Sequence, residues 1–182
     1  IQQGAPVDVF APASPKWLDA VGQDPGVIMS ATFARNRLIV IVPRDDPAHI
    51  TRLADLARRG VKLVLAAPGV PAGDYARQLL TNAGARAALK NVVSNEQDVE
   101  GVVAKVASGD ADAGIAYATD LTAAVSPMVR AIEIPIAENV VAVYQIGIVR
   151  GTKAEAVART FFHYVLGSGQ ATLRAAGFEV VR

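Results

Sequence analysis

Three segments of the sequence carry groups suited to chemistry, and none of them contains a lysine or arginine: residues 67–75, 94–99 and 114–120. The first two end where helices are expected to begin, and the third carries Tyr117. Backbone N–H groups at helix N-termini and a phenol hydroxyl are neutral hydrogen-bond donors that can hold a fully ionised oxyanion. The pattern therefore predicts an anion-binding site rather than an enzyme active site.

Catalytic alternatives find little support in the sequence. The chain has no cysteine and only two histidines, His49 and His163, which we expect to be structural or solvated. It contains no Gly-x-Ser-x-Gly, no Gly-x-Gly-x-x-Gly and no P-loop motif. Two unlinked histidines do not make a metal site. We therefore expect no enzymatic activity, no cofactor and no directly ligated metal cation.

Composition limits the partners of this chain. Hydrophobic residues make up 52% and charged residues 19% of the 182 residues, which is typical of a globular chain of one domain or two small lobes. The net charge of +1 gives no electrostatic reason to expect nucleic acid or an anionic membrane as a partner. No stretch reaches the roughly 18 apolar residues of a membrane span.

Strand and helix patterns alternate along the chain. Apolar runs predict strands at residues 7–11, 37–43, 61–66, 91–94, 113–118, 131–135 and 140–149. Helical spacing predicts helices at residues 51–59, 74–83, 153–166 and 170–176, another carrying Val99, Val102, Val103 and Val106, and a first one with Trp17, Leu18 and Val21 on one face. In the helix at 153–166 the expected packing residues are Val157, Phe161, Tyr164 and Val165. Such alternation predicts an α/β fold with mainly parallel strand pairing and ligands beyond the carboxyl ends of the strands.

Five segments in order resemble the periplasmic molybdate-binding proteins, the receptors of ABC-type molybdate and tungstate importers: residues 3–11, 36–43, 70–76, 98–99 and 114–120. The most specific are Val-Pro-Ala-Gly-x-Tyr-Ala at 70–76 and Gly-Ile-x-Tyr-x-x-Asp at 114–120. The resemblance implies a two-lobed periplasmic-binding-protein (type II) fold with the oxyanion in the interlobe cleft. It also implies that the main-chain N–H groups of Ala72 and Val99 and the hydroxyl of Tyr117 bind the oxyanion.

Each of these three residues also has an ordinary structural interpretation. Ala72 could belong to a plain strand–loop–helix connection, Val99 could be a first-turn core residue, and Tyr117 could be a core residue at a strand end. We expect Asp74 and Asp98 to cap helix starts and to point away from an anion. Asp120 is interpreted as structural.

The remaining ligands of the family are two serine segments, which this chain does not contain. The resemblance therefore implies that the N-terminal part is missing, that lobe one lacks its opening strands, and that anion binding is weakened. Lobe one is predicted at residues 1–43 plus 124–182, and lobe two at residues 44–123. The complete protein is expected to be a monomer.

The sequence thus predicts a receptor that binds molybdate or tungstate through neutral donors and delivers it to ABC permease subunits. A dianion offers only acceptors, whereas an anion such as phosphate carries a proton that needs an acceptor. Molybdate and tungstate are also larger than sulfate. The expected location is periplasmic or extracytoplasmic, with the protein free or lipid-anchored. The alternative is a cytosolic oxyanion-sensing effector domain of a transcriptional regulator with the same bilobal fold.

Overall fold

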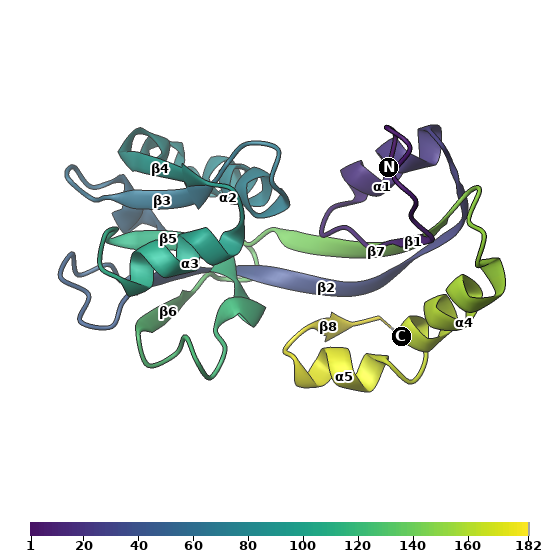
Figure 1. The fold of residues 1–182 in the computed structure, drawn as a ribbon. Helices are drawn as coiled ribbons and strands as arrows, with labels where there is room; N and C mark the ends of the chain where they lie inside the picture. Colours follow the sequence, from purple (N-terminus) through teal and green to yellow (C-terminus); the bar gives the residue numbers. More distant parts are fainter. Residues whose placement is uncertain (182) are drawn as a thin grey trace. The chain divides into compact units, whose positions relative to one another are not determined.

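The computed structural model describes residues 1–181, which form two compact units (Figure 1). Unit 1 contains residues 1–36 and 142–181, and unit 2 contains Arg37–Val141. Strand β2 (Val27–Pro43) contributes its first part to unit 1 and its second part to unit 2. In the part of the chain that the structure describes, no helix is long and apolar enough to cross a membrane.

Unit 1 is built on strands that pair antiparallel. Its elements besides β2 are β1 (Val9–Phe10), α1 (Pro15–Gln23), β7 (Val141–Val149), α4 (Glu155–Leu166), α5 (Gln170–Ala175) and β8 (Glu179–Val180). Strand β1 pairs with β7, and β8 pairs with β2 at Ala34 and Arg35. The predicted helices and strands of this unit are therefore present, and β8 is a further strand that was not predicted from the sequence.

The predicted buried residues of two helices in unit 1 are only partly confirmed. Helix α4 buries Ala158 and Phe162 against Ile146 and Ile148 of β7, and the predicted Val165 packs against this cluster. The other three predicted residues, Val157, Phe161 and Tyr164, are exposed. Helix α1 buries Leu18 and Val21 as expected but leaves Trp17 exposed. The apolar positions of α4 lie on more than one face of the helix, so spacing alone does not decide which face meets the sheet.

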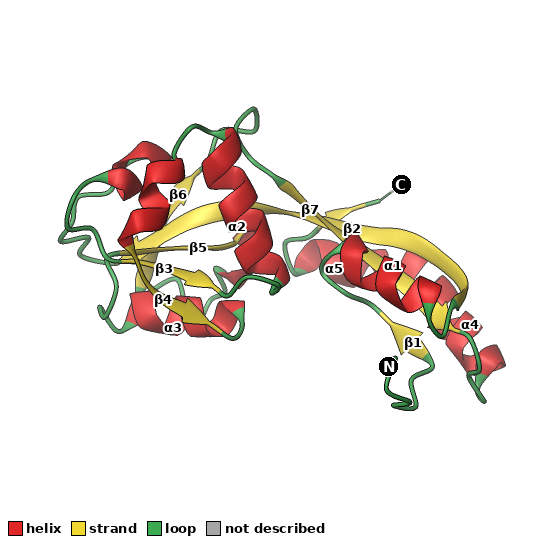
Figure 2. Ribbon diagram, turned by 90° about the horizontal axis from the view of Figure 1, so that it is seen from above, coloured by secondary structure: helices red, strands yellow, loops and turns green. Residues whose placement is uncertain are grey.

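Unit 2 contains the second part of β2 and most of the regular α/β alternation. Its other elements are η1 (Leu53–Ala57), β3 (Leu63–Ala66), α2 (Pro71–Asn82), η2 (Arg86–Asn91), β4 (Val92–Glu96), α3 (Val99–Ala107), β5 (Ala113–Tyr117), η3 (Ala118–Asp120) and β6 (Val129–Glu133). Strands β3 and β5 are buried along their whole length. Helices α2 and α3 both contact these two strands and cover opposite faces of the sheet (Figures 1 and 2).

The prediction of mainly parallel pairing is wrong for β2. Strand β3 lies parallel to β4 and β5, but β2 pairs antiparallel with β5 and with β6. The run Leu38–Val42 is buried throughout, which is the usual pattern of a parallel strand covered on both faces. An antiparallel strand in the middle of a covered sheet has the same pattern, so burial could not distinguish the two.

Several element boundaries also differ from the prediction. Strand β2 begins at Val27, ten residues before the predicted start. The prediction missed its first part because residues there alternate between more and less buried instead of forming a uniformly apolar run. The helix expected at 51–59 is only the short 3₁₀ helix η1. Helix α2 begins at Pro71 rather than at residue 74, since proline is favoured at the first helical position.

The two units divide at Asn36/Arg37 and at Val141/Ala142, whereas the predicted lobes divide at residues 43 and 124. Strand β6 falls in unit 2 because it pairs with residues 39–43 of β2. The assignment of these segments to two ligand-binding lobes stays a prediction.

Candidate functional site

The three predicted donors lie at one edge of the sheet of unit 2. Strands β3, β4 and β5 run in the same direction, so their carboxyl ends share that edge. Helix α2 follows β3, α3 follows β4, and β5 ends at Tyr117. The edge therefore carries the N-termini of two helices, one on each face of the sheet, together with a strand-end tyrosine.

Ala72 is the second residue of helix α2, not part of the preceding loop as the sequence suggested. Its side chain is buried, and its N–H belongs to the first turn, where no carbonyl lies four residues back within the helix. The first backbone bond of this turn is donated by the Asp74 N–H to the Val70 carbonyl, at 2.9 Å. The Ala72 N–H is thus available in the way that the prediction requires.

Gly73 explains how α2 approaches the end of β3 so closely. A Cβ at this position would lie 2.3 Å from the carbonyl oxygens of both Ala66 and Ala67. Real Cβ atoms do not approach backbone oxygens to that distance, so only glycine fits here. The glycine of the Val-Pro-Ala-Gly segment therefore determines where the first turn of α2 lies.

Val99 is the first residue of helix α3, and its N-cap is Asp98. The Asp98 carboxylate accepts a hydrogen bond of 2.8 Å from the Gly101 N–H, which confirms the predicted capping role. That bond engages the N–H of the third helical residue, so the Asp98 side chain does not use the Val99 N–H. The Asp74 carboxylate accepts instead from the Gly69 N–H at 2.8 Å, so it braces the loop before α2 rather than capping the helix.

Tyr117 ends β5 and is 5% exposed, with its hydroxyl oxygen buried. Its N–H donates to Oδ2 of Asp120 at 2.8 Å, which closes the short turn η3. Burial raises the pKa of Asp120 to about 6, the Tyr117 N–H opposes that rise, and the nearby Glu100 adds to it. Asp120 and Glu100 both line a hollow of about 400 Å³ between α3 and the segment after η3.

Arg77 is the residue of this edge that the sequence analysis missed. From the second turn of α2 its guanidinium reaches back and donates through Nη1 to the carbonyls of Ala66, at 2.7 Å, and Gly73, at 2.9 Å. Its Nη2 donates to Oδ1 of Asn95 in β4. Desolvation lowers the pKa of Arg77, and the charge of Asp74 opposes this. Its place four residues after Gly73 was the available signal, since such residues lie one above the other on a helix.

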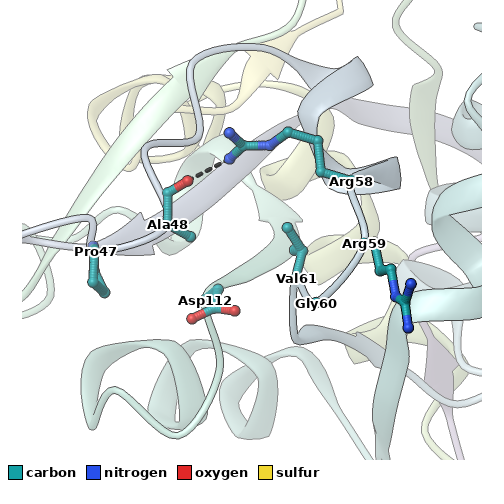
Figure 3. A pocket seen from close by; sticks show the side chains of 7 residues that line it. All are labelled: Pro47, Ala48, Arg58, Arg59, Gly60, Val61 and Asp112. Atoms are coloured by element: carbon teal, nitrogen blue, oxygen red, sulfur yellow. Dashed lines mark hydrogen bonds between the residues drawn. The ribbon is translucent and has the colours of Figure 1, made fainter.

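A second hollow of unit 2 lies at the other end of the parallel strands (Figure 3). It has a volume of about 420 Å³ and includes Val61, just before β3, and Asp112, just before β5. Its Arg58 is turned toward the Ala48 carbonyl, to which it donates (Figure 3). This hollow is therefore at the amino ends of the strands and does not include the predicted donors.

Both histidines, His49 and His163, are exposed, as expected for solvated side chains. Within residues 1–181, no three or more histidine, aspartate or glutamate side chains are grouped as a metal ion would require.

Comparisons with known proteins agree with this architecture. The family model of the bacterial extracellular solute-binding proteins matches residues 1–179. The molybdate-binding protein ModA of Mycobacterium tuberculosis is 34% identical over 181 residues, covering 98% of this chain and 67% of that protein. ModA of Escherichia coli is 30% identical over 194 residues, covering 99% of this chain and 73% of that protein.

A solved structure shows the same fold. The periplasmic molybdate-binding protein of Azotobacter vinelandii superimposes with a TM-score of 0.80 at 24% identity, covering 99% of this chain and 81% of that one. The predicted periplasmic-binding-protein fold is therefore confirmed. The chain belongs to the bacterial extracellular solute-binding proteins, as a relative of their molybdate-binding members.

Proposed function

We propose that this chain is a receptor that binds molybdate or tungstate outside the cytoplasm and presents it to the membrane subunits of an ABC importer. It performs no chemical step on the anion. The proposal is supported by the names of its relatives and by the family description, which places these proteins outside the cell and so favours a receptor over a cytosolic regulator.

The observation that carries the proposal is the set of neutral donors at one sheet edge. The N–H groups of Ala72 and Val99 lie in the first turns of α2 and α3. Tyr117 is the last residue of β5, and its hydroxyl is buried. Each helix N-terminus also carries a partial positive charge, which stabilises an anion by about 0.3–1 kcal/mol at an exposed site. A dianion that only accepts hydrogen bonds matches donors of this kind.

The carboxylates near these donors are consistent with an anion site because the backbone already engages them. Asp98 accepts from Gly101, Asp74 from Gly69, and Asp120 from Tyr117. A carboxylate held by a local N–H group is fixed in place and partly neutralised.

Calorimetric titration of the chain with molybdate, tungstate, sulfate and phosphate tests the proposal. We expect molybdate and tungstate to bind and sulfate and phosphate to bind at least about tenfold more weakly, a difference of about 1.4 kcal/mol. Absence of binding by all four anions, or tightest binding of phosphate, would contradict it.

A further inference from the structure

The Arg77 guanidinium contacts three separate parts of the candidate site. It donates to the end of β3 at the Ala66 carbonyl, to the first turn of α2 at the Gly73 carbonyl, and to the Asn95 side chain of β4. Arg77 is partly buried. A partly buried guanidinium with fixed acceptors loses little further freedom when a ligand binds nearby.

Two of these contacts lie close in sequence to the proposed backbone donors. Gly73 directly follows Ala72, and Asn95 lies four residues before Val99, near the end of β4. A backbone bond joins the same two segments, from the Ala67 N–H to the Glu96 carbonyl at 2.8 Å. The loop that presents Ala72 and the loop that presents Val99 follow strands that already pair in parallel, and this main-chain bond and the Arg77 guanidinium link them beyond the ends of those strands.

We propose that Arg77 is a positioning residue of the oxyanion site, which sets the spacing between the Ala72 and Val99 N–H groups without contacting the anion itself. This inference rests on the proposed function. The geometry favours arginine over lysine, because only a planar guanidinium presents several N–H groups at fixed angles, whereas an ammonium is a single point charge.

The test uses calorimetric titration of molybdate against four single variants. Arg77→Lys keeps the charge, Arg77→Met removes it, and Asn95→Ala removes only the acceptor on β4. Arg86→Lys is the matched control, because Arg86 is an exposed arginine at the start of η2. We expect both Arg77 variants to bind about tenfold more weakly, Asn95→Ala to show a smaller loss in the same direction, and the control to bind as the unmodified chain does.

A double-mutant cycle separates positioning from general destabilisation. Val99→Pro removes the Val99 N–H, so Arg77→Lys should then cost less than about threefold instead of about tenfold, because the group that it positions is gone. In a Tyr117→Phe background the full loss should persist, since the bonds of Arg77 to Ala66, Gly73 and Asn95 hold the loops before α2 and α3 and not the end of β5. A general loss of stability would weaken binding equally in both backgrounds, and the melting temperatures of all variants are recorded beside the affinities.

Each outcome decides the matter. If the unmodified chain binds molybdate and Arg77→Lys binds equally well, or loses the same factor in the Val99→Pro background, this inference is wrong and the proposed function stands. If the unmodified chain binds none of the anions, the proposed function fails and the inference fails with it. If the Arg77 variants do not fold, the Asn95→Ala variant alone decides.

Discussion

At the scale of the residue, Val99 offers a clean test of a backbone donor. It occupies the first position of α3, where a proline loses no helical hydrogen bond. Helices α1 and α2 already carry proline there, at Pro15 and Pro71. Asp98 has φ −151° and ψ 179°, an extended conformation that a residue before proline adopts readily.

We therefore predict that Val99→Pro keeps the free energy of unfolding within about 0.5 kcal/mol and weakens molybdate binding about 10- to 100-fold, as expected for a lost hydrogen bond to a charged ligand. Val99→Ala is the control, since it shortens the side chain and keeps the N–H. Calorimetry and urea unfolding measure both quantities. Equal affinities of the two variants would show that the Val99 N–H does not bind the anion.

The hydroxyl of Tyr117 can be removed without emptying the space of its ring. We expect Tyr117→Phe to weaken molybdate binding about 10- to 100-fold, because the donor is lost while the buried ring is kept. Tyr75→Phe is the control, as Tyr75 lies on the same helix as Ala72 but is not a predicted donor. The measurement is calorimetric titration, and unchanged affinity of Tyr117→Phe would remove Tyr117 from the site.

At the scale of the element, the contact between α2 and β3 depends on the missing side chain of Gly73. The carbonyls of Ala66 and Ala67 occupy the space where a Cβ would lie. Both are backbone atoms, so a larger residue cannot be accommodated by rotating a side chain. The helix itself has to move away from the strand.

We predict that Gly73→Ala lowers the free energy of unfolding by about 1–3 kcal/mol through overpacking, and weakens molybdate binding because Ala72 moves with the helix. Gly22→Ala is the matched control. Gly22 lies in α1 with nothing within 4 Å of its Cβ position, so the same substitution should stabilise by about 0.5–1 kcal/mol. Urea unfolding gives both values, and a stabilising Gly73→Ala would mean that α2 is not held against β3 in this way.

At the scale of the whole molecule, Asp120 makes stability depend on pH. Its pKa in the folded chain is about 6, above the ordinary value of 3.8, so between these values the folded state binds the proton more tightly than the unfolded state. The free energy of unfolding should therefore fall as the pH rises from about 4 to about 6. The pKa of Asp55 is lowered to about 2 by hydrogen bonds from Thr51 and Arg52. Its contribution to the free energy of unfolding is therefore lost only below about pH 4.

Asp120→Asn should remove most of this decline between pH 4 and 6, because the amide does not titrate while its oxygen can still accept from the Tyr117 N–H. Asp19→Asn, on the exposed side of α1, is the control. Urea unfolding of the anion-free chain at several pH values measures the slope. A slope that survives in Asp120→Asn would assign it to another group.

Short-range features of this protein could be predicted from sequence by itself. The helix start at Val99, the cap at Asp98 and the strand ending near Tyr117 depend on residues within a few positions of one another. A proline at a first helical position or an aspartate at an N-cap acts through the adjacent backbone alone. The five segments that resemble the family are also short stretches of sequence, so their presence in the right order was enough to indicate the family.

Only the tertiary structure decided the features that depend on residues distant in sequence. It placed β2 antiparallel to β5, turned Ala158 and Phe162 of α4 inward, brought Arg77 to the end of β4 and buried Asp120 beside Glu100. An apolar run is compatible with either strand direction, and a helix with apolar residues on several sides can pack any of them against the sheet. These choices depend on the packing of whole elements against each other, which no local pattern specifies.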